Sequence, residues 1–295
     1  MAEAARRAEG LGYSTLVFPD HLGDQLSPIP AMATVLAATD TLRAAPFVLN
    51  VDLHQPAVLA QDLASLDVLS DGRVDIAIGA GWNKPEYDAT GLDFDPVGTR
   101  VARLAEAIAV LKGCFAEGPF SRTGEHYTIT NLNGGPTTTQ QPHPPFMIGG
   151  GGRRTLELAG READIVGLAP RVAPGPRADP RSMTFEATAE KIGWVKAAAG
   201  DRADELEFNA YPSGAPVMVT DDLQGEARRV SDRLKQATGH ELTEQEVIDS
   251  PHIFIGSLDR LTEKFVELRE RLGISSIMVG QVDELAPVVE RLAGT

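Results

Sequence analysis

Short apolar runs alternate with longer amphipathic runs along the chain, and this order predicts repeated strand–helix units. Repeated units of this kind build a parallel sheet. A length of 295 residues is sufficient for a single α/β domain of the TIM (β/α)8 barrel class. Seven apolar runs are the expected barrel strands: 14–18, 47–50, 74–78, 146–148, 163–167, 206–210 and 274–279.

A barrel of this class closes with eight strands, so one strand has no counterpart among these seven. The chain opens on an expected helix, residues 2–11, and the missing strand is most simply the first. Either the sequence starts at an internal methionine or the barrel is open, and the first explanation is favoured because an unpaired sheet edge is a liability. We expect one barrel domain over 1–295, with insertions at about 83–98, 118–141 and 169–183. The last insertion is rich in proline and is expected to form a loop or lid.

Charge and composition narrow the classes of partner. The 27 basic and 42 acidic side chains give a net charge of −15, so nucleic acid would be repelled and an anionic ligand needs a local binding device. Cys114 is the only cysteine, which excludes an intrachain disulfide, and its place in an expected helix favours a buried, inert thiol. No apolar stretch approaches the roughly 20 residues of a membrane span, and the N-terminus lacks a hydrophobic signal core. We therefore predict a cytoplasmic protein with no membrane partner.

A run of four glycines is the first candidate binding feature. Gly149, Gly150, Gly151 and Gly152 lie between a short strand and an expected helix that begins with Arg153. A backbone without side chains can approach an anion closely, and the free N–H groups of the helix point toward it. Arg153 would add charge to that site. The alternative is a flexible turn with a solvated arginine, but four glycines cost considerable backbone entropy on folding.

Polar and small residues follow two other expected strands. Asp20 and His21 come directly after the strand at 14–18, where a barrel carries its catalytic residues. A histidine there can transfer protons near neutral pH, and the alternative is a polar turn. Gly79, Gly81 and Trp82 close the strand at 74–78 and would let a planar ring lie against the backbone, or else form a bulge with Trp82 packed under the next loop.

The other histidines show no ligand spacing with one another or with carboxylates, so no metal site is expected. Surface or structural roles are the better interpretation for His54, His126, His143, His240 and His252.

The ordered set of motifs resembles the luciferase-like monooxygenase family, in particular its coenzyme F420-dependent (deazaflavin) branch. The likeness spans nearly the whole chain, and each motif is weak alone. The motifs are Ala5–Glu9 with Leu11-Gly12-Tyr13, Pro19-Asp20-His21, Pro56-Ala57, Leu66–Arg73, Gly79–Trp82 with Glu86-Tyr87, Gly124–Tyr127, Pro144–Ile148 before the glycine run, Ala163-Asp164, Phe254–Ser257 and Leu272-Gly273-Ile274.

This resemblance implies an oxidoreductase that moves a hydride between F420 and a small organic substrate, with His21 and Asp20 at the reaction. It also implies a non-proline cis peptide bond at Phe47–Val48 against the ring, with Asn50 as a possible hydrogen-bond partner of the ring. Some sugar-phosphate dehydrogenases of this branch have a glutamate where Trp82 stands. Its absence argues against that substrate and leaves His21 without its usual acid partner.

Two alternatives stay open on the sequence alone. FMN could replace F420 in a monooxygenase that uses reduced flavin and O2, because both cofactors need the same ring shelf and phosphate turn. A non-catalytic barrel subunit is the alternative from another class. The resemblance also implies a possible homodimer. The substrate itself is not predicted.

Overall fold

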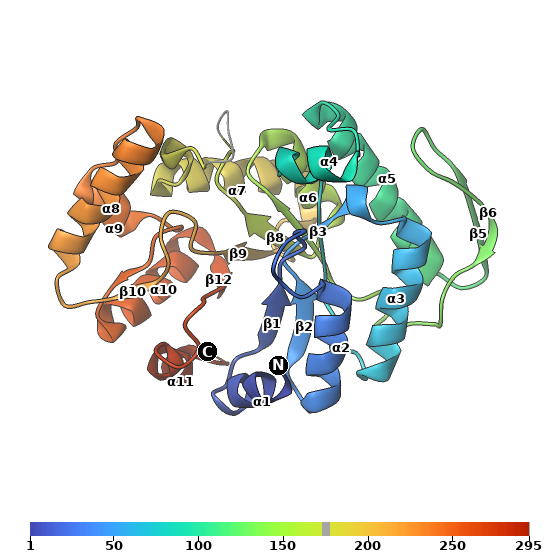
Figure 1. Ribbon diagram of the computed structural model, residues 1–295, viewed down its shortest axis with the longest axis horizontal. Coiled ribbons are helices and arrows are strands. Elements are labelled where there is room, and N and C mark those ends of the chain that lie inside the picture. Colours follow the sequence, from blue (N-terminus) through green and yellow to red (C-terminus); the bar gives the residue numbers. More distant parts are fainter. Residues whose placement is uncertain (173–177, 295) are drawn as a thin grey trace. The chain divides into compact units, whose positions relative to one another are not determined.

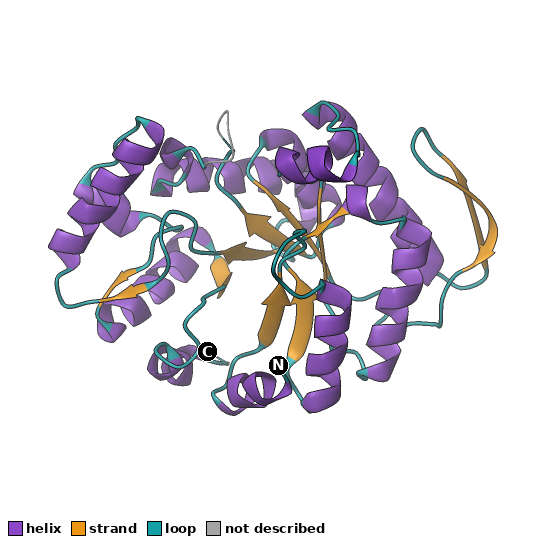
Figure 2. Ribbon diagram, in the orientation of Figure 1, coloured by secondary structure: helices purple, strands orange, loops and turns teal. Residues whose placement is uncertain are grey.

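A computed structural model describes residues 1–172 and 178–294 of the chain. Helices and parallel strands alternate along it (Figures 1 and 2). The residues group into two compact units, Met1–Ile148 and Gly149–Thr295. Among the described residues, no helix combines the length and the apolar character needed to cross a bilayer.

The first unit is built on parallel strands. Strand β1 pairs with β2, while β4 pairs with β3 on one side and β7 on the other. A parallel bridge between Ala44 and Val74 links β2 to the start of the β4 segment. The elements of this unit are α1 (Ala2–Gly10), β1 (Thr15–Phe18), α2 (Pro28–Ala38), β2 (Arg43–Pro46), β3 (Leu49–Asn50), the 3-10 turn η1 (Val51–Leu53), α3 (Pro56–Leu69), β4 (Ile76–Gly79), α4 (Lys84–Thr90), α5 (Val97–Phe115), β5 (Pro119–Thr123), β6 (Thr128–Asn133) and β7 (Phe146–Gly150), whose last two residues begin the second unit.

Two expectations for this unit need correction. The strand expected at 47–50 begins earlier, because β2 covers Arg43–Pro46 and only Leu49–Asn50 continues as β3. Pairing with β1 and a bidentate bond from the Arg43 guanidinium to Asp75 stabilise this segment, which local propensity does not favour. The insertion expected at 83–98 contains a helix, α4, which the sequence analysis did not include.

The second unit repeats the same strand–helix order. Strands β8, β9 and β12 are parallel neighbours, and β10 pairs with β11. The elements are α6 (Arg153–Glu162), β8 (Ile165–Leu168), η2 (Pro180–Ser182), α7 (Phe185–Ala199), η3 (Gly200–Arg202), β9 (Glu207–Ala210), β10 (Met218–Val219), α8 (Leu223–Thr238), α9 (Glu244–Asp249), β11 (Ile255–Gly256), α10 (Leu258–Leu272), β12 (Ile274–Ile277) and α11 (Ala286–Leu292).

The expected lid at 169–183 is described only in part, since residues 173–177 lie outside the described residues. Its two flanks are joined by an antiparallel bridge between Val172 and Ala178. The buried Lys191 amine donates to the carbonyl oxygens of Ala169 and Ser182 at 2.8 and 2.6 Å. One amine therefore holds both flanks of this segment.

His252 lies in the core of the second unit and provides a test of its packing. The side chain is fully buried, and burial together with nearby Lys191 lowers the pKa of the imidazole from 6.5 to about 3. The unfolded chain takes up a proton near pH 6.5, whereas the folded chain does not until about pH 3, so this group destabilises the fold as the pH falls through that window.

We expect His252→Leu to flatten the dependence of the unfolding free energy on pH. Between about pH 4 and pH 6 the slope should decrease by roughly 1 kcal/mol per pH unit, as measured by urea denaturation at each pH. The slope is the readout because it is insensitive to any constant packing cost of the substitution. An unchanged slope would contradict a neutral, buried His252.

Candidate active site

The strand ends of the first unit bring the predicted residues to one edge. Parallel neighbours have their carboxyl ends on the same side, and His21 follows β1, Phe47 follows β2 and Gly79 ends β4. The polar pair after the first strand and the small residues after β4 therefore occupy the same edge of this unit, as the topology predicts.

His21 has a carboxylate partner. Its Nδ1 lies 2.9 Å from Oε1 of Glu86, a nearly buried residue on α4. The same oxygen accepts the backbone N–H of Leu22 at 3.2 Å. Because a carboxylate only accepts hydrogen bonds, the contact places a proton on Nδ1 and makes Nε2 the nitrogen available to a ligand.

This pair overturns the expectation that His21 lacks an acid partner. Position 82 is a tryptophan, but the carboxylate comes from four residues farther along the chain. A helix signal was available in the sequence. Asn83 precedes the helix, Pro85 lies in its first turn and Gly91 adopts a left-handed conformation at its end.

Asp20 has partners other than His21. Its Oδ2 accepts the backbone N–H of Asn50 at 2.9 Å and lies 2.8 Å from Nε2 of His54. Asp20 thus ties the end of β1 to the end of β3, and His54 has the structural role expected for it. We infer that Asp20 positions the strand ends.

A cis peptide bond joins Phe47 and Val48, as the resemblance implies. Close to it in the chain, Oδ1 of Asn50 accepts the backbone N–H of Asp52 at 3.2 Å. The Tyr87 hydroxyl lies 3.1 Å from the same oxygen and makes its shorter bond, 2.8 Å, to Oδ2 of Asp52. The Asp52 N–H fixes the orientation of the amide, because the oxygen must face a donor. The amide nitrogen has no partner among the described residues, so Asn50 can donate to a ligand.

The glycine two residues after the end of β4, Gly81, is required by the packing of the protein itself. Gly81 has φ +71°, and a Cβ there would lie 1.9 Å from Oη of Tyr87. The guanidinium of Arg100 donates to the carbonyl oxygens of Ala80 and Gly81 and so fixes the conformation of this turn. Burial and neighbouring Asp52 raise the pKa of Tyr87 to about 12, so its hydroxyl remains a donor.

Trp82 is 47% exposed and lies edge-on to His21, with ring centroids 5.5 Å apart and an interplanar angle of 86°. It is therefore not packed under the following loop, which was the alternative interpretation. The indole is a neighbour of the acid–base candidate and remains available to a ligand. Of the predicted site residues of the first unit, Trp82 contacts His21, and Asp20 and Asn50 contact each other.

The four glycines at the end of β7 and directly after it have different local roles. A Cβ on Gly151 would lie 2.4 Å from the Pro170 carbonyl oxygen, and one on Gly150 would lie 2.6 Å from the Thr155 side chain. Close packing within the second unit therefore explains why Gly150 and Gly151 are glycines. Gly149 belongs to β7, like Gly150.

Gly152 is different, because a Cβ there would meet nothing within 4 Å. It is the N-cap of α6, and no described side chain caps this helix start. Open N–H groups at the start of a ten-residue helix fit an anion. Arg153 makes an exposed ion pair with Glu157 at 2.7 Å. Exposed pairs are weak, so Arg153 could leave Glu157 to bind another anion.

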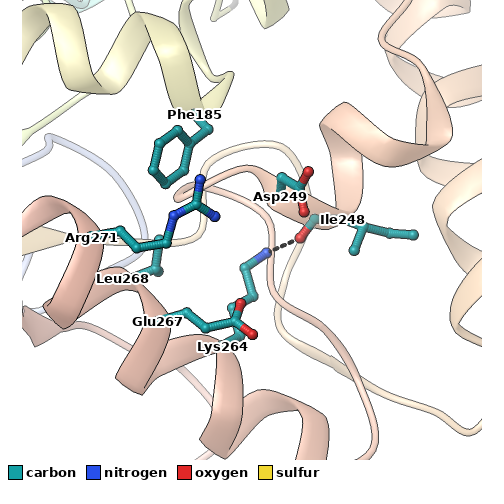
Figure 3. Close-up of a pocket in the computed structure, with 7 residues that line it drawn as sticks. All are labelled: Phe185, Ile248, Asp249, Lys264, Glu267, Leu268 and Arg271. Atoms are coloured by element: carbon teal, nitrogen blue, oxygen red, sulfur yellow. Dashed lines mark hydrogen bonds between the residues drawn. The ribbon is translucent and has the colours of Figure 1, made fainter.

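A pocket in the second unit presents a different kind of chemistry. Figure 3 shows Lys264 pointing toward the Ile248 carbonyl oxygen, with Arg271 beside the Phe185 ring. The Lys264 amine donates to Ile248 and Ile253 at 2.6 Å each, and Arg271 lies 4.0 Å over Phe185. Burial lowers the pKa of Lys264 to about 7. Its bonds join α10 to the end of α9, so we assign this lysine a structural role.

Comparison with known proteins places these features in context. Residues 1–276 match the sequence model of the family described as luciferase-like monooxygenase. An FMNH2-dependent dimethylsulfone monooxygenase of Pseudomonas putida is 29% identical over 196 residues, which cover 66% of this chain and 49% of that protein. An F420-dependent glucose-6-phosphate dehydrogenase of Kineococcus radiotolerans is 31% identical over 174 residues, which cover 56% of this chain and 50% of that protein. The chain thus matches about half the length of these relatives.

Solved structures share the fold. The coenzyme F420-dependent tetrahydromethanopterin reductase of Methanopyrus kandleri superposes with a TM-score of 0.75 at 18% identity, over 99% of this chain and 93% of that one. This likeness confirms the predicted TIM-barrel class.

Proposed function

The chain belongs to the luciferase-like monooxygenase family, and on that premise we propose that it is an F420-dependent oxidoreductase acting on a small organic substrate. The observation that carries this proposal is the His21–Glu86 pair at the strand ends of the first unit. An imidazole held by a carboxylate at the strand ends suits acid–base chemistry next to a bound ring.

The residues present fit a deazaflavin or a flavin. The Phe47–Val48 peptide and Gly79 would offer backbone for a ring to lie against, and the amide nitrogen of Asn50 is available as a donor. Gly81 would keep the turn after β4 close to Tyr87. Gly152 opens a helix N-terminus that suits a phosphate of the cofactor tail, and Arg153 would add charge there. In this proposal Phe47, Val48, Asn50, Gly79, Gly81 and Trp82 contact the ring, and 149–153 bind the tail.

In this proposal the protein positions the cofactor and the substrate and transfers the substrate proton. The bound deazaflavin would supply or accept the hydride. His21 would give or take the substrate proton at Nε2, because Nδ1 is held by Glu86. The Glu86 carboxylate would stabilise the protonated ring, and Asp20 would hold the end of β3 in place. Trp82 would exclude water from one flank of His21.

A monooxygenase that uses reduced FMN is the second candidate. The relative from Pseudomonas putida, with its FMNH2 dependence, favours it, and the relative from Kineococcus radiotolerans and the fold neighbour from Methanopyrus kandleri favour F420. We rank F420 first because the Asp20–His21 pair follows the pattern of the F420 branch. A non-catalytic barrel remains the third possibility.

Equilibrium titration of the purified protein with F420 and with FMN separates these candidates. Saturable binding of F420 that is at least tenfold tighter than binding of FMN supports the proposal. Tight binding of FMN alone favours the monooxygenase, and binding of neither cofactor favours the non-catalytic barrel. Fluorescence of the deazaflavin or flavin gives the readout.

Glu86→Gln tests the role of the carboxylate. We expect turnover to fall roughly 10- to 100-fold while cofactor affinity is unchanged, because glutamine keeps an acceptor for the Leu22 N–H but loses the charge that stabilises protonated His21. The dependence of turnover on pH should shift as well, which a purely structural role would not produce.

The control is Asp88→Asn on the same helix, since Asp88 is exposed and pairs only with Lys84 at the surface among the described residues. It should leave turnover unchanged. Equal turnover and an identical pH profile for Glu86→Gln and Asp88→Asn would remove Glu86 from the mechanism.

A further inference from the structure

The loop after β1 holds two leucines in solvent close to His21 in the chain. Leu22 is 55% exposed and Leu26 is 56% exposed. The loop is fixed by its own polar groups, because the Gln25 side chain donates to the carbonyl oxygens of Pro19 and His21 at 2.9 Å each. Hydrogen bonds therefore hold these leucines at the surface, and a loose loop does not account for their exposure.

Glu86 and Trp82 place this apolar surface next to the imidazole. One carboxylate oxygen of Glu86 binds both His21 and the N–H of Leu22, so the two residues are positioned together. The exposed Trp82 ring meets the imidazole edge-on. The acid–base candidate thus has an exposed indole against its ring and an exposed leucine as the next residue in the chain. Single exposed apolar residues are common on proteins, but apolar groups gathered around a reactive histidine point to a ligand.

The cations that α4 and α5 bring to these strand ends are already engaged. Lys84 pairs with Asp88 at 2.6 Å, and Arg103 pairs with Asp52 at 2.7 Å. Arg100 is used by the carbonyl oxygens of the turn at residues 80 and 81. An anionic group on a substrate would have to break one of these contacts.

The groups nearest the imidazole are also unfavourable to an anion. The carboxylate of Glu86 binds the imidazole directly. The carboxylate of Asp20, on the preceding residue, is bonded to the Asn50 N–H and to His54. A carboxylate or phosphate of the substrate close to the imidazole would be repelled by Glu86.

We propose that the site selects an uncharged substrate with an apolar body, and that Leu22 and Trp82 determine this specificity. The inference rests on the proposed function, since it assigns the surroundings of His21 to the substrate. An apolar substrate would cover the leucine and the indole, and the removal of this apolar surface from water would strengthen its binding. An anionic substrate of the same size would bury less apolar surface and would be repelled by the Glu86 carboxylate, so it would bind more weakly.

A matched pair of ketones tests the proposal by binding alone. 2-Heptanone and 6-oxoheptanoate both have seven carbons and differ in a terminal methyl group against a carboxylate. Their affinities are measured by calorimetry on the full chain, both before and after the addition of F420. We expect 2-heptanone to bind at least about tenfold more tightly than 6-oxoheptanoate.

Leu22→Lys tests whether Leu22 determines the preference for an uncharged substrate. This substitution should weaken the binding of 2-heptanone about tenfold and strengthen the binding of 6-oxoheptanoate. The ratio of the two affinities would then come close to one or be inverted. The control is Leu69→Lys at the end of α3, where an 83% exposed leucine lies at the opposite end of a strand–helix unit from the carboxyl ends of the strands. This variant should leave the ratio unchanged.

Several results would overturn the inference: equal or tighter binding of 6-oxoheptanoate to the unaltered protein, binding of neither ketone at 10 mM (about the top of a practical titration), or an unchanged ratio in Leu22→Lys. A change of sedimentation in Leu22→Lys with an unchanged ratio would assign the leucines to contact with another protein chain. Failure of F420 and FMN to bind would instead reject the proposed function, and the affinity ratio measured without cofactor keeps the two failures apart.

Discussion

His21→Ala should lower turnover by about 10³-fold, within the range found for loss of a positioned acid–base group. Cofactor affinity should change little, because His21 faces the substrate in this account and the ring is held by backbone at Phe47–Val48 and by Asn50. Steady-state kinetics together with a cofactor titration separate the two effects.

The control is His240→Ala, an exposed histidine after α8 in the second unit, which should leave both quantities unaltered. Loss of cofactor affinity in His21→Ala that is as large as the loss of turnover would make His21 a ring-binding residue. Unchanged turnover would remove His21 from the chemistry altogether.

Gly152→Asp should weaken cofactor binding by 100-fold or more while the fold is retained or stabilised. The backbone at Gly152 is extended (φ −97°, ψ 147°), and a Cβ there meets nothing within 4 Å, so an aspartate fits. Aspartate is a good N-cap residue and would satisfy the free N–H groups of α6. Its charge would occupy the place proposed for the phosphate and repel it.

Thermal unfolding separates this effect from misfolding. The melting temperature of Gly152→Asp should equal or exceed that of the unaltered protein. Gly152→Asn is the matched control, since it caps the helix without a charge and should cost less affinity. Unaltered cofactor binding in Gly152→Asp would show that the tail lies elsewhere and that the glycine run serves packing alone.

Much of the fold and part of the site follow from sequence because they depend on local pattern. Alternating apolar and amphipathic runs predicted the strand–helix units, and the carboxyl ends of the strands predicted where Asp20 and His21 lie. The cis peptide at Phe47–Val48 followed from the resemblance and not from any local signal. The strand at 43–46 was missed because its stability comes from pairing with β1 and from the distant Asp75.

The partners within the site depend on distances that a linear pattern does not contain. Glu86 lies 65 residues from His21 along the chain, and His54 lies 34 from Asp20. The resemblance points to a carboxylate at position 82, whereas α4 presents one four residues later, at Glu86. The roles of the individual glycines were also hidden, since only the packing separates Gly151, which the fold requires, from Gly152, which it leaves open.

The crystal structure of the F420 complex tests the central claim most directly. We predict the ring against the Phe47–Val48 peptide, within hydrogen-bond reach of the Asn50 amide nitrogen and with Nε2 of His21 facing the substrate side. We predict the phosphate of the tail at the backbone of residues 149–152. A ring bound away from His21 and Phe47, or a phosphate remote from the start of α6, would contradict the account.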